Sequence, residues 1–274
     1  MKIKVSPIDA RIIKAFLAVI GIISSIISIV CIFITIPNNC KLYSAIALVV
    51  LFILVYAGMF INANIKKSAR MKINNTSIEI IYGDLFKISG LKVIGFNEYF
   101  DTIVDNVIIS EKSLHGKYIK ENISNIDEFD RFIEKCLANK KCSINSSRPL
   151  GKKKRYKLGT LFEYNNEFIF TSFAKFDERN RACLKFEEFI EFFITFWNEI
   201  DVINNGRDVN IPLMGSGITR FNSPVSKQEL LELTLFTLKY SGVKLCYDCK
   251  LRIILHKSVA DEINLYKLKE TFGE

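Results

Sequence analysis

Two long runs of uncharged, apolar residues near the N-terminus limit what this chain can fold into. The first extends from Ala15 to Ile36 and the second from Leu42 to Ile61. Each has about the 20 residues that an α-helix needs to cross a hydrocarbon core of roughly 30 Å. A signal peptide is the alternative for the first run, but its apolar core is long for a leader and a second run follows at once. Both runs therefore predict membrane-spanning helices.

The basic residues around these runs predict their orientation. Only residues 37–41 separate the runs, which predicts a tight hairpin with both ends on one side of the membrane. Basic residues gather at those ends, with only Lys41 in the link: Lys2, Lys4, Arg11, Lys14, Lys66, Lys67, Arg70 and Lys72. Because cytoplasmic flanks carry an excess of Lys and Arg, the sequence predicts a two-pass membrane protein with both termini in the cytoplasm.

The distribution of charge argues against nucleic-acid binding. The 274-residue chain has a net charge of +9, and residues 1–72 hold nine basic residues and one acidic residue. The remaining 202 residues hold 29 basic and 28 acidic residues, whereas a nucleic-acid-binding domain needs a basic surplus of its own. The basic cluster GKKKRYK at residues 151–157 is expected to be a solvated hairpin tip, with a headgroup or phosphate contact as the alternative.

The seven cysteines do not predict a metal site. Cys246 and Cys249 form a single CxxC pair, and no second pair or histidine set lies near them in the sequence. A structural zinc site needs further Cys or His ligands. In the cytoplasm the thiols are expected to stay reduced.

Beyond Lys72, short apolar runs alternate with amphipathic stretches, which predicts alternating strands and helices. The predicted strands are residues 77–83, 91–97, 209–214 and 251–256, with a hairpin over 159–174 that turns at Asn165-Asn166. The predicted helices are residues 126–138, 184–200 and 227–240, the last capped by Ser226. The pattern predicts a transmembrane helical hairpin over residues 1–72. A three-layer α/β domain with a mixed sheet between helices is predicted for residues 73–274.

Three predicted strands end in residues that suit a ligand. The first ends at Gly83-Asp84, the second at Asn97, and a later one runs into Gly215-Ser216-Gly217. Ligands of open α/β sheets bind beyond the carboxyl ends of the strands. Glycines let backbone N–H groups approach a phosphate, and a carboxylate such as that of Asp84 can accept a hydrogen bond from an amino group.

The order of these motifs resembles that of the macro domain, the ADP-ribose-binding module. The stretches that carry the resemblance are YGDLF, VIGFNEYFDT, SEKSLHGKYI and IPLMGSGITRF. With the two apolar runs, the LGT hairpin and FDERNRA, the whole chain is similar to the membrane effector of type II Thoeris, a bacterial anti-phage defence system. The stretch SEKSLHGKYI at residues 110–119 is then expected to be a glycine-rich loop that closes over the phosphates.

The resemblance also implies which residues contact a ligand. Asp84 and Leu85 would hold the adenine and its ribose. The distal ribose and any group conjugated to it would meet Asn97, Phe100, Asp101, Thr102, His115 and Gly116. The diphosphate would meet Ser113, Leu114, Gly215, Ser216, Gly217, Ile218, Thr219 and Arg220.

Five of the side chains have a second interpretation. His115 either contacts the distal group or forms a local hydrogen bond. Asp101 either touches the distal ribose or caps a turn, and Phe100 either stacks on the ligand or belongs to the core. Arg220 either pairs with a phosphate or is solvated. His256, at the end of the last strand, is expected to be a core histidine, with a place near the adenine as the alternative.

The resemblance implies a nucleotide-gated effector in the bacterial plasma membrane. A TIR-domain enzyme would make an ADP-ribose-type signal from NAD, with an ADP-ribose–amino acid conjugate as one candidate. The chain would bind it, assemble into a homo-oligomer or rearrange, and disrupt the lipid bilayer as abortive infection. A membrane-anchored ADP-ribosyl hydrolase is the first alternative, although Leu114-His115-Gly116 stands where hydrolases carry consecutive glycines. A passive membrane scaffold is the second.

Overall fold

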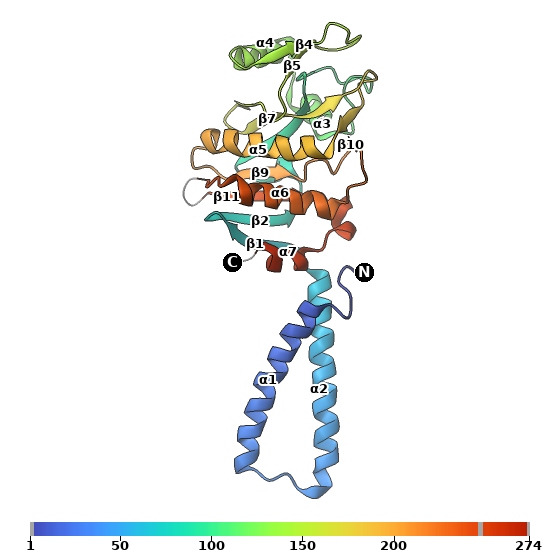
Figure 1. The fold of residues 1–274 in the computed structure, drawn as a ribbon, viewed down its shortest axis with the longest axis vertical. Coiled ribbons are helices and arrows are strands. Elements are labelled where there is room, and N and C mark those ends of the chain that lie inside the picture. The colour runs from blue at the N-terminus through green and yellow to red at the C-terminus, as the bar shows by residue number, and fades with distance from the viewer. Residues whose placement is uncertain (1–2, 246–248, 273–274) are drawn as a thin grey trace. The chain divides into compact units, whose positions relative to one another are not determined.

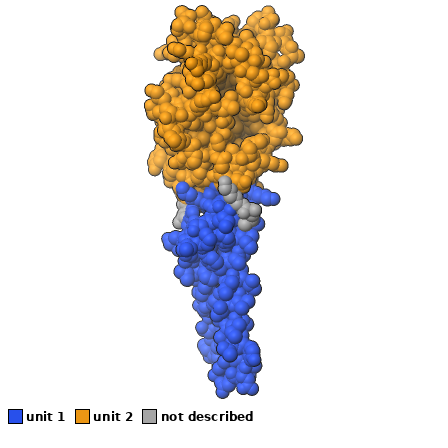
Figure 2. Space-filling model, turned by 90° about the vertical axis from the view of Figure 1, so that its right-hand side faces the viewer, with its two compact units in different colours: residues 1–67, 264–267 blue, residues 68–263, 268–274 orange. Residues whose placement is uncertain are grey.

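The computed structural model describes residues 3–245 and 249–272 of the chain, so that Cys246 of the CxxC pair lies outside the described residues. Internal contacts divide the chain into two compact units, which Figure 2 colours separately. The first unit comprises residues 1–67 and 264–267, and the second comprises residues 68–263 and 268–274. The boundary predicted at residues 72 and 73 stays a prediction.

Two long helices, α1 (Ala10–Phe33) and α2 (Asn38–Ile65), make up most of the first unit (Figure 1). Their most apolar 18-residue windows have mean hydropathies of 2.8 and 2.7, and no residue of either window is buried inside the structure. The exposed apolar surface distinguishes them from the core helices of a soluble domain. By length and composition, both helices are candidate membrane spans.

A buried asparagine ties the N-terminal segment to the end of α2. The Asn64 side chain accepts hydrogen bonds from the backbone N–H groups of Lys4 at 2.7 Å and Val5 at 3.0 Å. Its amide group donates to the carbonyl of Phe60 at 2.9 Å. The apolar side chains of Val5 and Ile12 pack beside it with Ala63, so that the base of the helical hairpin has a small core of its own.

The second unit is built around a nine-stranded mixed sheet. Its strands are β1 (Ser68–Ile73), β2 (Thr76–Tyr82), β3 (Leu91–Asn97), β6 (Leu161–Tyr164), β7 (Phe168–Phe176), β8 (Ala182–Leu184), β9 (Val209–Pro212), β10 (Arg220–Phe221) and β11 (Lys250–Leu255). The spatial order is β1-β2-β11-β9-β3-β7-β8-β10, and β6 pairs with β7. Five central strands run parallel to one another, in the order β2-β11-β9-β3-β7. Antiparallel pairs form between β1 and β2, between β6 and β7, and between β7 and β8.

Five more α-helices follow in the described part of the chain, and the last of them begins in residues that belong to the first unit. They are α3 (Leu114–Asn122), α4 (Ile126–Leu137), α5 (Phe186–Ile203), α6 (Lys227–Ser241) and α7 (Leu265–Phe272), with the short 3-10 helices η1 (Leu85–Lys87) and η2 (Lys257–Glu262). A separate two-stranded sheet pairs β4 (Cys142–Ile144) with β5 (Lys154–Tyr156).

Alternating phenylalanines of β7 show why the unit has three layers. Phe170 contacts Tyr118 of α3 and Phe129 of α4, with ring centroids 4.9 and 5.7 Å away. Phe173 instead contacts Phe189 and Phe192 of α5, at 6.2 and 4.9 Å. Because successive strand residues point to opposite faces, the two phenylalanines anchor helices on the two sides of the sheet. The predicted three-layer α/β class with a mixed sheet is confirmed.

Two predicted segments differ from the structure. Residues 110–119 are not a glycine-rich loop, because Leu114 begins helix α3 and the Ser113 hydroxyl accepts a hydrogen bond from the Gly116 N–H at 2.9 Å as its N-cap. Residues 151–157 belong to the β4–β5 hairpin, and Lys153, Lys154, Arg155 and Lys157 are exposed, so the expected solvated hairpin tip is wrong only at Lys152 and Tyr156. Residues Lys154–Tyr156 form β5, and the Lys152 ammonium donates to Asp130 at 2.6 Å and to the Phe100 carbonyl at 2.7 Å.

Candidate functional site

A cleft of about 650 Å³ lies at the carboxyl ends of β3, β7 and β9. The ends of these strands line it together with residues 106–110, the start of α3, the β7–β8 turn and the loop that follows β9. Residues at the start of η2, which follows β11, complete the lining. Parallel strands therefore bring distant parts of the sequence to one edge of the sheet, in a cleft of the size typical of small-molecule sites.

The loop after β9 contains two glycines with different roles. Gly215 has a φ of +78°, and a Cβ atom there would lie 2.8 Å from the Phe221 ring, so the loop conformation requires glycine. A Cβ atom on Gly217 would meet nothing within 4 Å. The loop turns back on itself through Ser216, whose N–H and hydroxyl both donate to the Leu213 carbonyl. The backbone beside Gly217 is open to the cleft, as an anion site requires.

The start of α3 forms a second wall of the cleft. Ser113, Leu114 and His115 line it, so the helix N-terminus, with its free N–H groups and partial positive charge, belongs to the site. Gly116 is not among the lining residues. A Cβ atom there would lie 2.2 Å from the Ser110 carbonyl oxygen, so this glycine lets the helix start pack against the preceding loop.

His115 presents a buried nitrogen with no hydrogen-bond partner among the described residues. Its side chain is 6% exposed and its ring centroid lies 3.5 Å from that of Phe96. Burial lowers the pKa of His115 to about 3, reinforced by the charge of Lys152 and opposed by a hydrogen bond with the Asp101 backbone. The ring is therefore neutral near pH 7. Its Nε2 atom makes no hydrogen bond within the described protein, although the residue lines the cleft.

Positive charge dominates the polar side chains of the cleft. Among the residues that the structure describes, the lining contains no aspartate or glutamate. It contains five basic residues: Lys112, Lys117, Arg179, Arg181 and Arg220. One of them, Arg181, pairs with Asp177 outside the lining at 2.7 Å. This balance favours an anionic ligand.

The structure brings ten of the sixteen predicted site residues together as lining of the cleft. They are Asn97, Ser113, Leu114, His115, Gly215, Ser216, Gly217, Ile218, Thr219 and Arg220. The other six are not part of the lining: Asp84, Leu85, Phe100, Asp101, Thr102 and Gly116. Contact with a ligand stays a prediction for both groups.

Four of the residues outside the lining have structural roles. Asp84 is exposed and caps η1 by accepting a hydrogen bond from the Phe86 N–H at 3.1 Å, and Leu85 is buried in the core. Phe100 is fully buried beside Phe96 with a φ of +51°. The Thr102 hydroxyl donates to Asp130 at 2.7 Å.

Asp101 belongs to a buried ion pair with Arg148. Two hydrogen bonds of 3.1 and 2.7 Å join the guanidinium to the carboxylate, and the two side chains are 4% and 2% exposed. Arg148 also donates to Asn180 at 2.7 Å, while Asn97 donates to Asp101 at 3.0 Å. Both asparagines line the cleft, and the ion pair itself does not. The ion pair therefore holds these two lining side chains in place through hydrogen bonds. No sequence pattern singled out Arg148, which lies in an irregular segment.

Two further parts of the lining were not expected. The FDERNRA stretch supplies Arg179, Asn180 and Arg181 to the cleft. His256 also lines it, and it is exposed rather than a core histidine as expected. It follows the end of β11 and caps η2, because its Nδ1 atom accepts a hydrogen bond from the Ser258 N–H at 3.2 Å.

Comparison with known proteins identifies the second unit. Residues 78–256 match the family model described as Thoeris protein ThsA, Macro domain, which is well over half of the chain. The chain belongs to this ThsA macro-domain family. The ThsA-like sequence is 39% identical over 244 residues to Thoeris protein ThsA of Bacillus amyloliquefaciens (strain Y2), which covers 87% of this chain and 82% of that protein. The predicted resemblance to a macro domain and to a Thoeris protein is thereby confirmed.

Solved macrodomain structures are similar to this chain at low sequence identity. A variant of the Oceanobacillus iheyensis macrodomain with ADPR is 12% identical, with a TM-score of 0.49 over 75% of this chain and 97% of that one. Another variant of the same macrodomain is 11% identical, with a TM-score of 0.47 over 76% and 97% of the two chains.

Proposed function

We propose that this chain is a membrane-anchored sensor that binds an ADP-ribose-type nucleotide in the cleft. The observation that carries the proposal is the cleft itself. Two backbone anion sites, the Gly217 loop and the start of α3, line one space of about 650 Å³ that holds five basic side chains. A diphosphate carries two negative charges and spans two adjacent anion sites. Membership in the ThsA macro-domain family supports a ligand of the ADP-ribose type.

The distal part of the ligand would lie toward His115 and Asn97. The unpartnered Nε2 of His115 offers a hydrogen bond that the described protein does not use. An unsatisfied buried polar atom costs about 1–3 kcal/mol, so a ligand group that pairs with it gains that energy back. The group conjugated to the distal ribose, an amino acid among the candidates, would then be recognised by the wall that Asn180 and the Asp101–Arg148 pair support.

The membrane part of the proposal rests on α1 and α2. We place both helices across the bacterial plasma membrane with the termini in the cytoplasm, where a signal made from NAD by a TIR-domain enzyme would reach the cleft. A ligand shifts a conformational equilibrium only through its different affinities for the two states. A 100-fold preference for an assembled state supplies roughly 2.7 kcal/mol per site, and a homo-oligomer sums this over its subunits.

The polar lining suits binding better than hydrolysis. A hydrolase needs a base that positions water, and carboxylates and histidines usually serve. The described lining holds no carboxylate, the Asp101 carboxylate is fully engaged with Arg148, and burial keeps the pKa of His115 near 3. We therefore favour a nucleotide sensor over a membrane-anchored hydrolase. We also favour it over a passive scaffold, because a scaffold does not require a ligand-binding cleft.

Gly217→Glu gives a clean test of nucleotide binding. The full chain in detergent micelles is titrated calorimetrically with ADP-ribose, NAD and AMP. A carboxylate at Gly217 enters open space and faces the diphosphate, so we expect ADP-ribose affinity to fall by about 100-fold, since like charges brought together cost several kcal/mol. Ser223→Glu adds the same charge at an exposed position outside the lining and should leave affinity unchanged. Equal affinity in both variants, or no binding of any of these nucleotides, would refute the proposal.

A further inference from the structure

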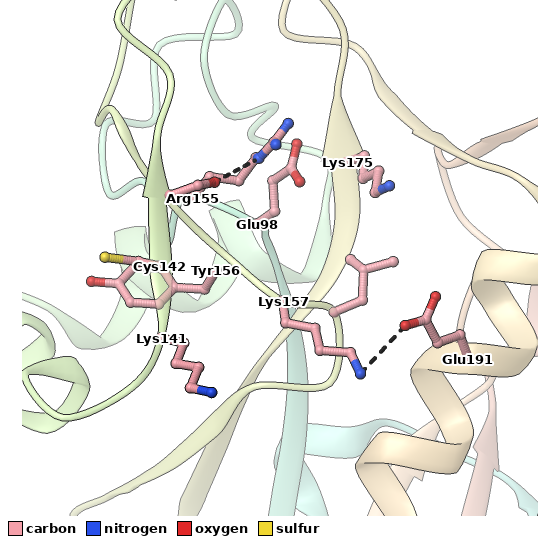
Figure 3. A pocket seen from close by; sticks show the side chains of 10 residues that line it. Glu98, Lys141, Cys142, Arg155, Tyr156, Lys157, Lys175 and Glu191 are labelled. Atoms are coloured by element: carbon pink, nitrogen blue, oxygen red, sulfur yellow. Dashed lines mark hydrogen bonds and ion pairs between the residues drawn. The ribbon is translucent and has the colours of Figure 1, made fainter.

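A second pocket, of about 320 Å³, lies near the ends of β3 and β7, two of the strands that line the cleft. The two pockets share no lining residue. Figure 3 shows the side chains of the second pocket, which come from the β4–β5 hairpin, the end of β3, β7 and α5. Glu98 and Lys175 line it, and the residues directly before them, Asn97 and Ala174, line the cleft. Because successive residues of an extended chain point to opposite sides, the two pockets lie back to back.

The second pocket holds an excess of positive charge. Four basic residues line it, and α5 neutralises two of them: Lys175 pairs with Glu188 at 2.6 Å, and Lys157 pairs with Glu191 at 3.4 Å. The other two, Lys141 and Arg155, form no ion pair with any described residue. Arg155 makes only a hydrogen bond of 3.3 Å from its Nε to the Ser143 hydroxyl. Two cationic groups therefore remain for an anion.

Glu98 gives the pocket an acceptor as well. Its side chain is 4% exposed, and its only hydrogen bond among the described residues is a long one of 3.4 Å from the Phe176 N–H. Burial raises the pKa of Glu98, while that hydrogen bond and the charges of Arg155 and Lys175 oppose the rise. A carboxylate can accept about four hydrogen bonds, so most of its capacity is unused.

We propose that this second pocket binds a small phosphorylated polyol, with the phosphate on Lys141 and Arg155 and a hydroxyl group donating to Glu98. Inorganic phosphate alone would satisfy the two cations but would leave Glu98 without a donor. A neutral sugar would pair with Glu98 but would make no use of the two cationic side chains, which are exposed beside the pocket. A volume of about 320 Å³ lies at the lower end of small-molecule sites, which fits a compound of the size of a pentose phosphate.

The test uses the full chain in detergent with the main cleft disabled by Gly217→Glu, or the unmodified chain saturated with ADP-ribose. Ribose 5-phosphate, ribose and inorganic phosphate are titrated calorimetrically. We expect ribose 5-phosphate to bind at least tenfold more tightly than either fragment. The Lys141→Ala, Arg155→Ala double variant should weaken both phosphate-containing ligands at least tenfold. Lys154→Ala, which removes an exposed charge of the same strand outside the pocket, should change neither.

Glu98→Gln separates the two halves of the recognition. Without the carboxylate, inorganic phosphate should bind as tightly as before or more tightly, while the advantage of ribose 5-phosphate over phosphate should disappear. Failure of ribose 5-phosphate to bind in both cleft-blocked forms overturns the proposal, and so does an equal loss in Lys154→Ala. The Gly217→Glu form alters the cleft whether or not a nucleotide binds there, so its outcome does not depend on the nucleotide-sensor proposal. The outcome in the form saturated with ADP-ribose rests on that proposal.

One further arm distinguishes two sources of the same chemistry. The headgroup of phosphatidylglycerol joins a phosphate to a diol, as a soluble polyol phosphate does. Vesicles of phosphatidylglycerol and, as a control, phosphatidylcholine are tested for competition with ribose 5-phosphate. Competition by the first lipid alone assigns the pocket to a headgroup, and no competition assigns it to a soluble compound.

Discussion

His115 is the residue at which burial decides the chemistry of the cleft. An exposed histidine would be partly protonated near neutral pH and would attract the phosphates as a cation. Here burial lowers the pKa of His115 to about 3, so the ring is neutral near pH 7. It can form a hydrogen bond but cannot pair with a charge. A ligand at this position would find no charge to pair with, and the positive charge of the cleft comes from its arginines and lysines.

Folding stability should report this burial through its pH dependence. Burial lowers the pKa of His115 to about 3 in the folded chain from its ordinary value of 6.5, so the unfolded state binds the proton first as pH falls. Stability is therefore lost as pH falls from 6.5 toward 3, by about 2 kcal/mol between pH 7.5 and pH 5. His115→Phe removes this titration but keeps a flat ring against Phe96. We expect urea unfolding of the variant to show a correspondingly smaller loss between these two pH values, and an identical loss would contradict the buried, neutral state.

The two glycines of the β9 loop show how far single residues could be predicted. Both were expected to contact the diphosphate, because Gly-Ser-Gly after a strand is typical of an anion-binding loop. The structure separates them: Gly215 is fixed by its φ of +78° and by the Phe221 ring, whereas Gly217 is free of both constraints. That difference depends on a side chain six residues away and could not be seen in the sequence pattern. A charge at Gly215 would test folding, and only a charge at Gly217 tests binding.

Elements defined by local chemistry were predicted well. The hairpin turns at Asn165 and Asn166, which have φ values of +52° and +54°, and α6 begins with the Ser226–Glu229 capping box. The place of β7 between β3 and β8 was not predicted, because strand partners are chosen by long-range packing. The start of α3 was missed although Ser113 is a good N-cap, because the glycine at 116 favoured a loop.

The segment between β4 and β5 was also beyond local patterns, and its buried ion pair makes a prediction at this scale. Arg148→Leu leaves the Asp101 carboxylate buried without its partner, which typically costs roughly 3–5 kcal/mol of unfolding free energy. Asp101→Asn combined with Arg148→Leu removes both charges and should recover most of that loss. Denaturant unfolding of the two single variants and the double variant gives the coupling energy. Additive effects of the single changes would mean that the pair does not brace the wall of the cleft.

The whole molecule combines a domain that suits a soluble nucleotide with two helices that suit a bilayer. The sequence predicted both halves, because apolar length and the order of motifs are properties of the chain itself. It could not predict which residues line the cleft, since the six predicted residues outside the lining differ from the other ten in tertiary packing. In the proposed function, nucleotide binding in the second unit acts on the first, and a measurement on the intact chain tests this step.

Leakage from vesicles tests that step. The full chain is reconstituted in vesicles that hold a self-quenched dye, with the second unit outside, and ADP-ribose or an ADP-ribose–amino acid conjugate is added. We expect release that depends on the nucleotide and rises more steeply than linearly with the density of chains, because the ligand stabilises an assembled state. Gly217→Glu should insert equally but release no dye, and Ser223→Glu should behave as the unmodified chain. Equal release with and without nucleotide would mean that α1 and α2 permeabilise the vesicles independently of the nucleotide, which contradicts the proposed gating. No dye release under any condition, with nucleotide binding intact, would mean that the chain binds the nucleotide without disrupting the bilayer.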